Sequence, residues 1–162
     1  MISALRLGGT RTNRACGCWL VALFTVLCVA ACSASLPRVK IDTLGINVAT
    51  QANLNTPIAV DVVMARNAQL FDTLLGLPAA KWFNERDQLQ RDYPKDLSVQ
   101  TYELVPGQQL PDQPFPFGGQ RAAGVLVFAG YQTPGAHRIR IDGGPQKALL
   151  LLGDQDLRLV SR

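Results

Sequence analysis

All four cysteines of this 162-residue chain lie within its first 32 positions, as Cys16, Cys18, Cys28 and Cys32. The rest of the chain must therefore fold without an internal disulfide and depend on the burial of apolar side chains. Its length is close to the commonest size of a single domain, and allows about two-thirds of the unfolded surface to be buried. One domain is expected.

The first 31 residues have the layout of a secretory signal peptide. Arg6, Arg11 and Arg14 precede an apolar run from Trp19 to Ala31, and no acidic residue interrupts this stretch. A transmembrane helix needs about 20 apolar residues to cross the hydrocarbon layer. The run is shorter than that, so the segment is expected to be removed from the mature protein.

The end of the apolar run, Val29-Ala30-Ala31-Cys32, resembles the bacterial lipobox. The resemblance implies a lipoprotein signal peptide of residues 1–31, with acylation of the Cys32 thiol and cleavage of the chain before it. Ser33, rather than aspartate, follows this cysteine, which implies the inner leaflet of the outer membrane, facing the periplasm. The alternative is an ordinary signal peptide, in which Cys32 is a simple thiol near the cleavage site of a soluble product.

The positive charge of the chain comes largely from the leader. Removing the three leader arginines lowers the formal net charge from +4 to +1. The remaining sequence has no stripe of lysine and arginine and no interleaved aromatic platform, which are typical of nucleic-acid-binding proteins. No nucleic-acid partner is predicted.

The domain is expected over residues 39–162, after a lipidated cysteine and short tether of residues 32–38. Its first apolar alternation, residues 39–49, changes phase beside Gly45, which indicates a strand with a bulge. A second alternation over residues 58–66 predicts another strand. Because only the turn-forming sequence QANLNTP separates them, these two strands are expected to pair as neighbours.

A helical hairpin is predicted as an insertion at about residues 67–93. Asn67 is a plausible N-cap of a short helix that ends at Gly76. Pro78 suits the first turn of a second helix, and Pro94 stops it. Trp82 and Phe83 of the second helix are interpreted as packing against a sheet, although they could also serve as surface anchors.

The second half of the chain is predicted to form mostly short strands. A Pro106-Gly107 turn and a proline-rich loop precede AAGVLVFAGYQ, whose two apolar faces indicate a central strand covered on both sides. Gly143-Gly144 predicts a tight hairpin between the next two strands. With about seven strands, the sequence predicts a mainly β fold, an antiparallel β-sandwich with the helices packed to one side or end.

Nothing in the sequence indicates an enzyme. His137 is the only histidine, and its alternation with Ile139 and Ile141 favours a histidine at the rim or satisfied within the fold. No G-x-S-x-G motif is present, and no cysteine after Cys32 can act as a nucleophile. Asp154 and Asp156 alone do not make a metal site. We predict no catalytic residue, metal, cofactor or small-molecule substrate.

The sequence PFPFGG is the most distinctive surface candidate. Phe115 and Phe117 lie on a proline-stiffened loop and could present aromatic anchors to a partner protein. The alternative is that both rings fold back and cover one end of the sandwich.

The order of these features resembles the TssJ family, the outer-membrane lipoproteins of the type VI secretion system. The resemblance covers nearly the whole mature chain. It rests on ANLN before PIAVDVVMARN, on the hairpin through FDTLLGL and WFNERDQL, and on TYELVPGQ with its Pro106-Gly107-Gln108 turn before AAGVLVFAGYQ.

The resemblance implies a transthyretin-like β-sandwich that tethers the periplasmic C-terminal region of the inner-membrane protein TssM to the outer membrane. It also implies a contact through the loop between the first two strands, residues 50–57, with Asn53, Leu54, Asn55 and Thr56 at its tip. The alternative function is a periplasmic lipoprotein that acts as a pilotin or assembly factor of another envelope machine, holding a peptide along an exposed strand.

Replacing Cys32 with serine tests the lipid anchor. A triacylated cysteine holds a protein on a membrane much more firmly than a single chain does. The Cys32→Ser protein is therefore expected in the soluble fraction after cell fractionation, whereas the unaltered protein sediments with membranes. Full membrane association of the Cys32→Ser protein would contradict the prediction.

Overall fold

The structure is a computed structural model in which residues 35–141 and 147–161 are described. The predicted signal peptide, Cys32 and the Gly143-Gly144 turn lie outside these residues. None of the described helices is long and apolar enough to cross a membrane. The strands are β1 (Thr43–Val48), β2 (Ile58–Ala65), β3 (Leu97–Leu104), β4 (Gln109–Pro114), β5 (Gly124–Ala129), β6 (Arg138–Ile141), β7 (Lys147–Leu152) and β8 (Leu157–Ser161), and the helices are α2 (Ala52–Asn55), α3 (Ala68–Leu75) and α4 (Ala79–Asp92).

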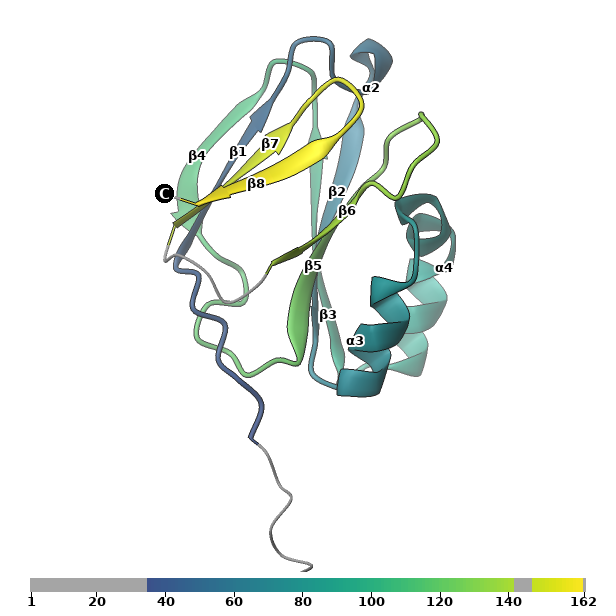
Figure 1. Cartoon of the computed structure of the whole chain (residues 1–162), viewed down its shortest axis with the longest axis vertical. Coiled ribbons are helices and arrows are strands. Elements are labelled where there is room, and N and C mark those ends of the chain that lie inside the picture. The colour runs from purple at the N-terminus through teal and green to yellow at the C-terminus, as the bar shows by residue number, and fades with distance from the viewer. Residues whose placement is uncertain (1–34, 142–146, 162) are drawn as a thin grey trace, which may run out of the picture. The chain divides into compact units, whose positions relative to one another are not determined.

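The strands form two four-stranded sheets that enclose a shared apolar core. One sheet has the order β4-β1-β7-β8 and the other has the order β3-β2-β5-β6 (Figure 1). The strand pairs of both sheets are antiparallel, except for the parallel pair of β1 and β7. The predicted mainly β sandwich is therefore confirmed.

Two predicted pairings are wrong, because strands that follow each other in the sequence belong to different sheets. β1 pairs with β4 and β7, whereas β2 pairs with β3 and β5. Likewise β6 pairs with β5 while β7 pairs with β1 and β8, so they do not form the hairpin expected at Gly143-Gly144. Alternation shows which face of a strand is buried, but two strands can bury their faces in one core from opposite sides.

The proline-rich segment contributes an eighth strand that the sequence reading missed. Residues Gln109–Pro114 form β4 at the edge of its sheet, and an edge strand tolerates proline because its outer N–H groups need no partner. The bulge expected beside Gly45 is confirmed, since the register against β4 shifts between Leu44 and Ile46. A Cβ atom on Gly45 would lie only 2.7 Å from an oxygen of Asp112.

β5 is the central strand that the sequence predicted. Val125 and Val127 belong to the core between the sheets, whereas Leu126 and Phe128 belong to a second core beneath the helices. α3 and α4 cover this outer face of the β3-β2-β5-β6 sheet (Figure 1). Both faces of the strand are therefore buried.

The helical insertion has the caps that the sequence predicts. The Asn67 side chain accepts a hydrogen bond from the backbone N–H of Leu70 at 3.0 Å, Gly76 ends α3, and Pro78 immediately precedes α4. Trp82 stacks on Phe128, with ring centroids 4.9 Å apart. The interpretation of Trp82 as a packing residue is confirmed.

A buried carboxylate fastens α4 to the sheet. Asp61 on β2 is fully buried and accepts hydrogen bonds from Trp82 Nε1 at 2.8 Å, Arg86 Nη1 at 3.0 Å and Thr101 Oγ1 at 2.6 Å. Removing one partner of a buried ion pair commonly costs about 3–5 kcal/mol, because the other charge is left uncompensated. Asp61 therefore fixes the position of the helical hairpin.

Candidate partner-binding site

Four connections meet at the end of the sandwich to which β1 and β5 run. They are the β1–β2 loop (49–57), the β3–β4 turn (105–108), the β5–β6 loop (130–137) and the β7–β8 turn (153–156), and we call this region the loop end. In Figure 1, α2 and the β7–β8 turn lie together at this end. The predicted contact loop is therefore part of a larger surface.

The tip of the β1–β2 loop has an unusual backbone. Asn53, Leu54 and Asn55 have φ values of 51°, 57° and 59°. This left-handed region is unfavourable for residues other than glycine, and costs on the order of 1–2 kcal/mol per residue for a leucine. Such a conformation persists only where the surrounding structure enforces it.

Hydrogen bonds of Asn53 hold the loop tip in this conformation. Its Oδ1 accepts a hydrogen bond from Gln132 N at 2.6 Å, its Nδ2 donates to Pro57 O at 2.9 Å, and its backbone N–H donates to Asp154 O at 2.9 Å. The residue is only 1% exposed. Asn53 thus joins three loops and is not accessible to a partner.

Thr56 also serves the loop's own structure. Its hydroxyl donates to Asn53 O at 2.6 Å and accepts from Gln132 Nε2 at 2.9 Å. The exposed residues of the predicted tip are Leu54, with 60% of its surface accessible, and Asn55. The structure therefore divides the four predicted contact residues into two that hold the loop and two that face outward.

Val105 is a second exposed apolar side chain at the loop end, 52% accessible. Its turn is attached to the β1–β2 loop, because Gly107 N donates to Ala49 O at 3.1 Å. Gly107 has a φ of 77°, which the Pro106-Gly107 turn requires. Leu54 and Val105 therefore lie on adjoining connections, and the sequence reading did not identify Val105.

Phe115 and Phe117 are not exposed, so the expectation of aromatic anchors on the surface is wrong. Both rings are buried in the sandwich core and pack edge to face, with centroids 6.2 Å apart. They follow β4 at the opposite end from the loop end, where Phe115 N donates to Asp42 O at 2.8 Å. The alternative, rings that cover one end of the sandwich, is what the structure contains.

Tyr131 ties the β5–β6 loop to the β7–β8 turn. Its hydroxyl donates to Gly153 O at 3.0 Å and also lies within hydrogen-bonding distance of Asp156 O. Burial, followed by the negative charges of Asp156 and Asp154, raises the pKa of this phenol well above its ordinary value. Tyr131 is therefore a neutral structural donor at physiological pH.

The histidine of this region has a structural environment. His137 Nε2 lies 2.7 Å from Thr133 O, and its ring centroid lies 4.8 Å from that of Tyr131. This matches the interpretation of a satisfied rim histidine. Within the described residues, no three His, Cys, Asp or Glu side chains gather as a metal site would require. The loop end thus offers apolar and amide contacts on a rigid backbone.

The sequence matches no family model and no curated protein. The structure is similar to Serratia marcescens Lip, a membrane-bound component of the type VI secretion system, with a TM-score of 0.52 and 19% identity over 74% of this chain and 96% of that one. It is also similar to the type VI secretion lipoprotein TssJ1 of Pseudomonas aeruginosa, with a TM-score of 0.55 and 17% identity over 74% and 94% of the two chains. This chain has a TssJ-like fold.

A third similar chain comes from a structure of the TssM C-terminal domain (869-1107) of the type VI secretion system from EAEC. Its TM-score is 0.54, with 16% identity over 73% of this chain and 98% of that one. The first two of these proteins are described as a membrane-bound component and a lipoprotein of the type VI secretion system.

Replacing Tyr131 with phenylalanine tests the hydrogen bond that joins the β5–β6 loop to the β7–β8 turn. At pH 8 the variant is expected to be about 1 kcal/mol less stable, because the Gly153 carbonyl loses its donor. Above pH 10 the phenol ionises in the unfolded chain but stays protonated in the fold, so the unaltered protein loses about 1.4 kcal/mol per pH unit relative to the variant.

Urea unfolding at pH 8 and pH 11 measures this difference. The difference in free energy of unfolding between the two proteins is expected to close near pH 11. The other tyrosines ionise alike in both proteins, so their contributions to this difference cancel. A gap that stays the same at both pH values would show that the Tyr131 pKa is not raised by the fold.

Proposed function

We propose that this protein is an outer-membrane lipoprotein of a type VI secretion membrane complex. Cys32 anchors it in the inner leaflet, and the domain tethers the periplasmic C-terminal region of an inner-membrane TssM-like protein. The observation that carries the proposal is the TssJ-like fold, found on a chain whose predicted signal peptide, residues 1–31, is followed by Cys32 in the lipobox-like sequence Val29-Ala30-Ala31-Cys32.

Leu54 is the proposed centre of the contact with the TssM-like protein. A large apolar side chain that is 60% exposed gains free energy when a partner covers it. Because Asn53 and Thr56 already hold the loop in its strained conformation, little further ordering is needed when the partner binds. Preorganisation of this kind increases affinity. Asn55 and Val105, which are also exposed at the loop end, are proposed to belong to the same contact.

The direction of the strands supports a tether. β1 begins 11 residues after Cys32 in the sequence and leads to the β1–β2 loop, and its six residues span about 20 Å. The described chain therefore enters the sandwich at the end opposite the proposed contact. A tether needs this separation, and it needs no reacting side chain.

The alternative role, a pilotin or assembly factor, has one structural observation in its favour. β3 is an eight-residue edge strand in regular register with β2, and no described strand pairs with its outer edge. An extended peptide could add to such an edge through backbone hydrogen bonds. This contact would involve residues 97–104 rather than Leu54.

Titration calorimetry tests the proposal. Residues 33–162 are titrated with the periplasmic C-terminal region of the TssM-like protein from the same genome, and saturable one-site binding is expected. Leu54→Asp is expected to weaken it at least tenfold, as for a central contact residue. Val160→Asp is the matched control, because Val160 is 40% exposed on β8, away from the loop end.

Two results would contradict this account. The absence of heat and of co-elution with the unaltered domain at high micromolar concentration would remove the TssM-like partner and favour the pilotin or assembly-factor role. Binding that Leu54→Asp and Val160→Asp weaken equally would keep the partner but exclude the loop end as its contact.

A further inference from the structure

The end of the sandwich opposite the loop end carries several basic side chains. We call this region the tether end, and it consists of residues 36–42 and 115–123 with the adjoining ends of β6 and β7. Its exposed basic residues are Arg38, Lys40, Arg121, Arg140 and Lys147. They come from three separate parts of the sequence, so no run of basic residues marks them.

Hydrogen bonds to backbone groups hold the Arg38 and Arg121 side chains in place. Their backbones form an isolated antiparallel bridge. Arg38 Nη1 donates to Gly119 O at 2.8 Å, and Arg121 Nη1 donates to Leu36 O at 2.9 Å. Both acceptors are neutral carbonyl groups. A guanidinium has five N–H donors, so each arginine keeps donors for a further anionic partner.

Little negative charge offsets these groups. In the part of the chain that the structure describes, Arg38, Lys40 and Arg121 form no ion pair, whereas Lys81 and Arg158 elsewhere on the domain are each beside a carboxylate. Asp42 is an exposed acid at the tether end. Among the described residues of the tether end, Arg38, Lys40 and Arg121 alone outnumber Asp42, which favours a positive charge on this part of the surface.

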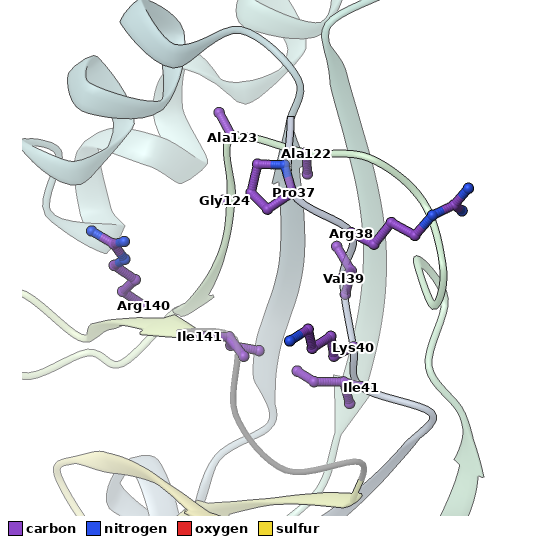
Figure 2. A pocket seen from close by; sticks show the side chains of 10 residues that line it. All are labelled: Pro37, Arg38, Val39, Lys40, Ile41, Ala122, Ala123, Gly124, Arg140 and Ile141. Carbon is purple, nitrogen blue, oxygen red and sulfur yellow. The ribbon is translucent and has the colours of Figure 1, made fainter. Parts of the chain in front are cut away.

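The charges spread over a face and do not converge on one point. A shallow pocket of about 130 Å³ lies between Lys40 and Arg140, with Pro37, Ala122 and Ile141 in its wall (Figure 2). Figure 2 shows that Arg38 extends away from this pocket, and that Arg140 lies on the opposite side of the pocket from Arg38. The Arg140 guanidinium is also placed over the Phe71 ring, 5.2 Å from its centroid. A broad anionic surface fits this arrangement better than a single small anion.

A membrane surface is the anionic partner that this end would meet. Arg38 follows Cys32 by six residues, a span of at most about 20 Å. A lipidated Cys32 would therefore keep the tether end close to the headgroups, where basic residues are attracted to anionic lipids over roughly a Debye length. We propose that the tether end binds the anionic phospholipid headgroups of the membrane that holds Cys32.

Such binding would orient the domain. With the tether end against the headgroups, the strands direct Leu54 and the rest of the loop end away from the membrane. The inference depends on the proposed anchor for its cellular setting. The binding itself needs neither the lipid on Cys32 nor the TssM-like partner, so it can fail or succeed independently of the proposed function.

Vesicle sedimentation tests this inference with residues 33–162, which include the compact unit of residues 36–162 with both cores. The vesicles contain equal parts of phosphatidylglycerol and phosphatidylcholine, or phosphatidylcholine alone. Binding is expected only to the anionic vesicles, and raised salt should weaken it.

Matched double variants locate the surface. Arg38→Gln with Lys40→Gln removes two charges from the tether end and is expected to lower the partition coefficient on the order of 25-fold, about fivefold for each charge. Lys81→Gln with Arg158→Gln makes the same change in net charge on exposed residues outside the tether end, and is expected to have much less effect.

Three results would overturn the inference. They are equal binding to neutral and anionic vesicles, equal losses in the two double variants, and saturable binding of free glycerophosphate without any binding to vesicles. Circular dichroism of each double variant shows whether it is folded. If the tether-end variant unfolds, Lys147→Gln alone is measured, with a loss of about fivefold expected and no loss overturning the inference.

Discussion

The burial of β2 and β5 on both of their faces is the constraint on which the rest of the structure depends. One face of these strands closes the sandwich core, and the other requires the cover that α3 and α4 provide. Asp61 of β2 joins this cover to the sheet, because Trp82 and Arg86 of α4 donate hydrogen bonds to its carboxylate, as does Thr101 of β3. A fully buried carboxylate is tolerated only with such partners in place. With both faces of this sheet occupied, neither face of β2 or β5 is available for contacts with other molecules.

The two ends differ in chemistry in a way that suits a tether. At the loop end, Asn53 and Tyr131 join separate loops and hold Leu54 outward on a left-handed backbone. At the other end, arginines fixed by backbone carbonyls present positive charge beside the point where the chain leads back to Cys32. The proposed function requires only binding at the two ends.

Local features of the fold were predictable from the sequence, whereas long-range ones were not. The Asn67 cap, the Gly45 bulge and the apolar faces of β5 depend on residues within a few positions of one another. The sheet to which a strand belongs depends on distant partners, which explains the wrong pairing of β1 with β2. At the proposed contact, the β1–β2 loop was predicted through a resemblance, and its role stays a prediction. The sequence could not show that Asn53 is buried, although asparagine is common in left-handed turns, or that Phe115 folds inward.

Site-specific photocrosslinking in cells tests the central claim most directly. A photoreactive residue replaces Leu54 in the full-length lipoprotein, and in a second strain it replaces Val160, which is also exposed. The account predicts an adduct between position 54 and the TssM-like protein, and none from position 160. An adduct from position 160 without one from position 54 would contradict the account, because the partner would then bind the edge strand β8 and not the loop end.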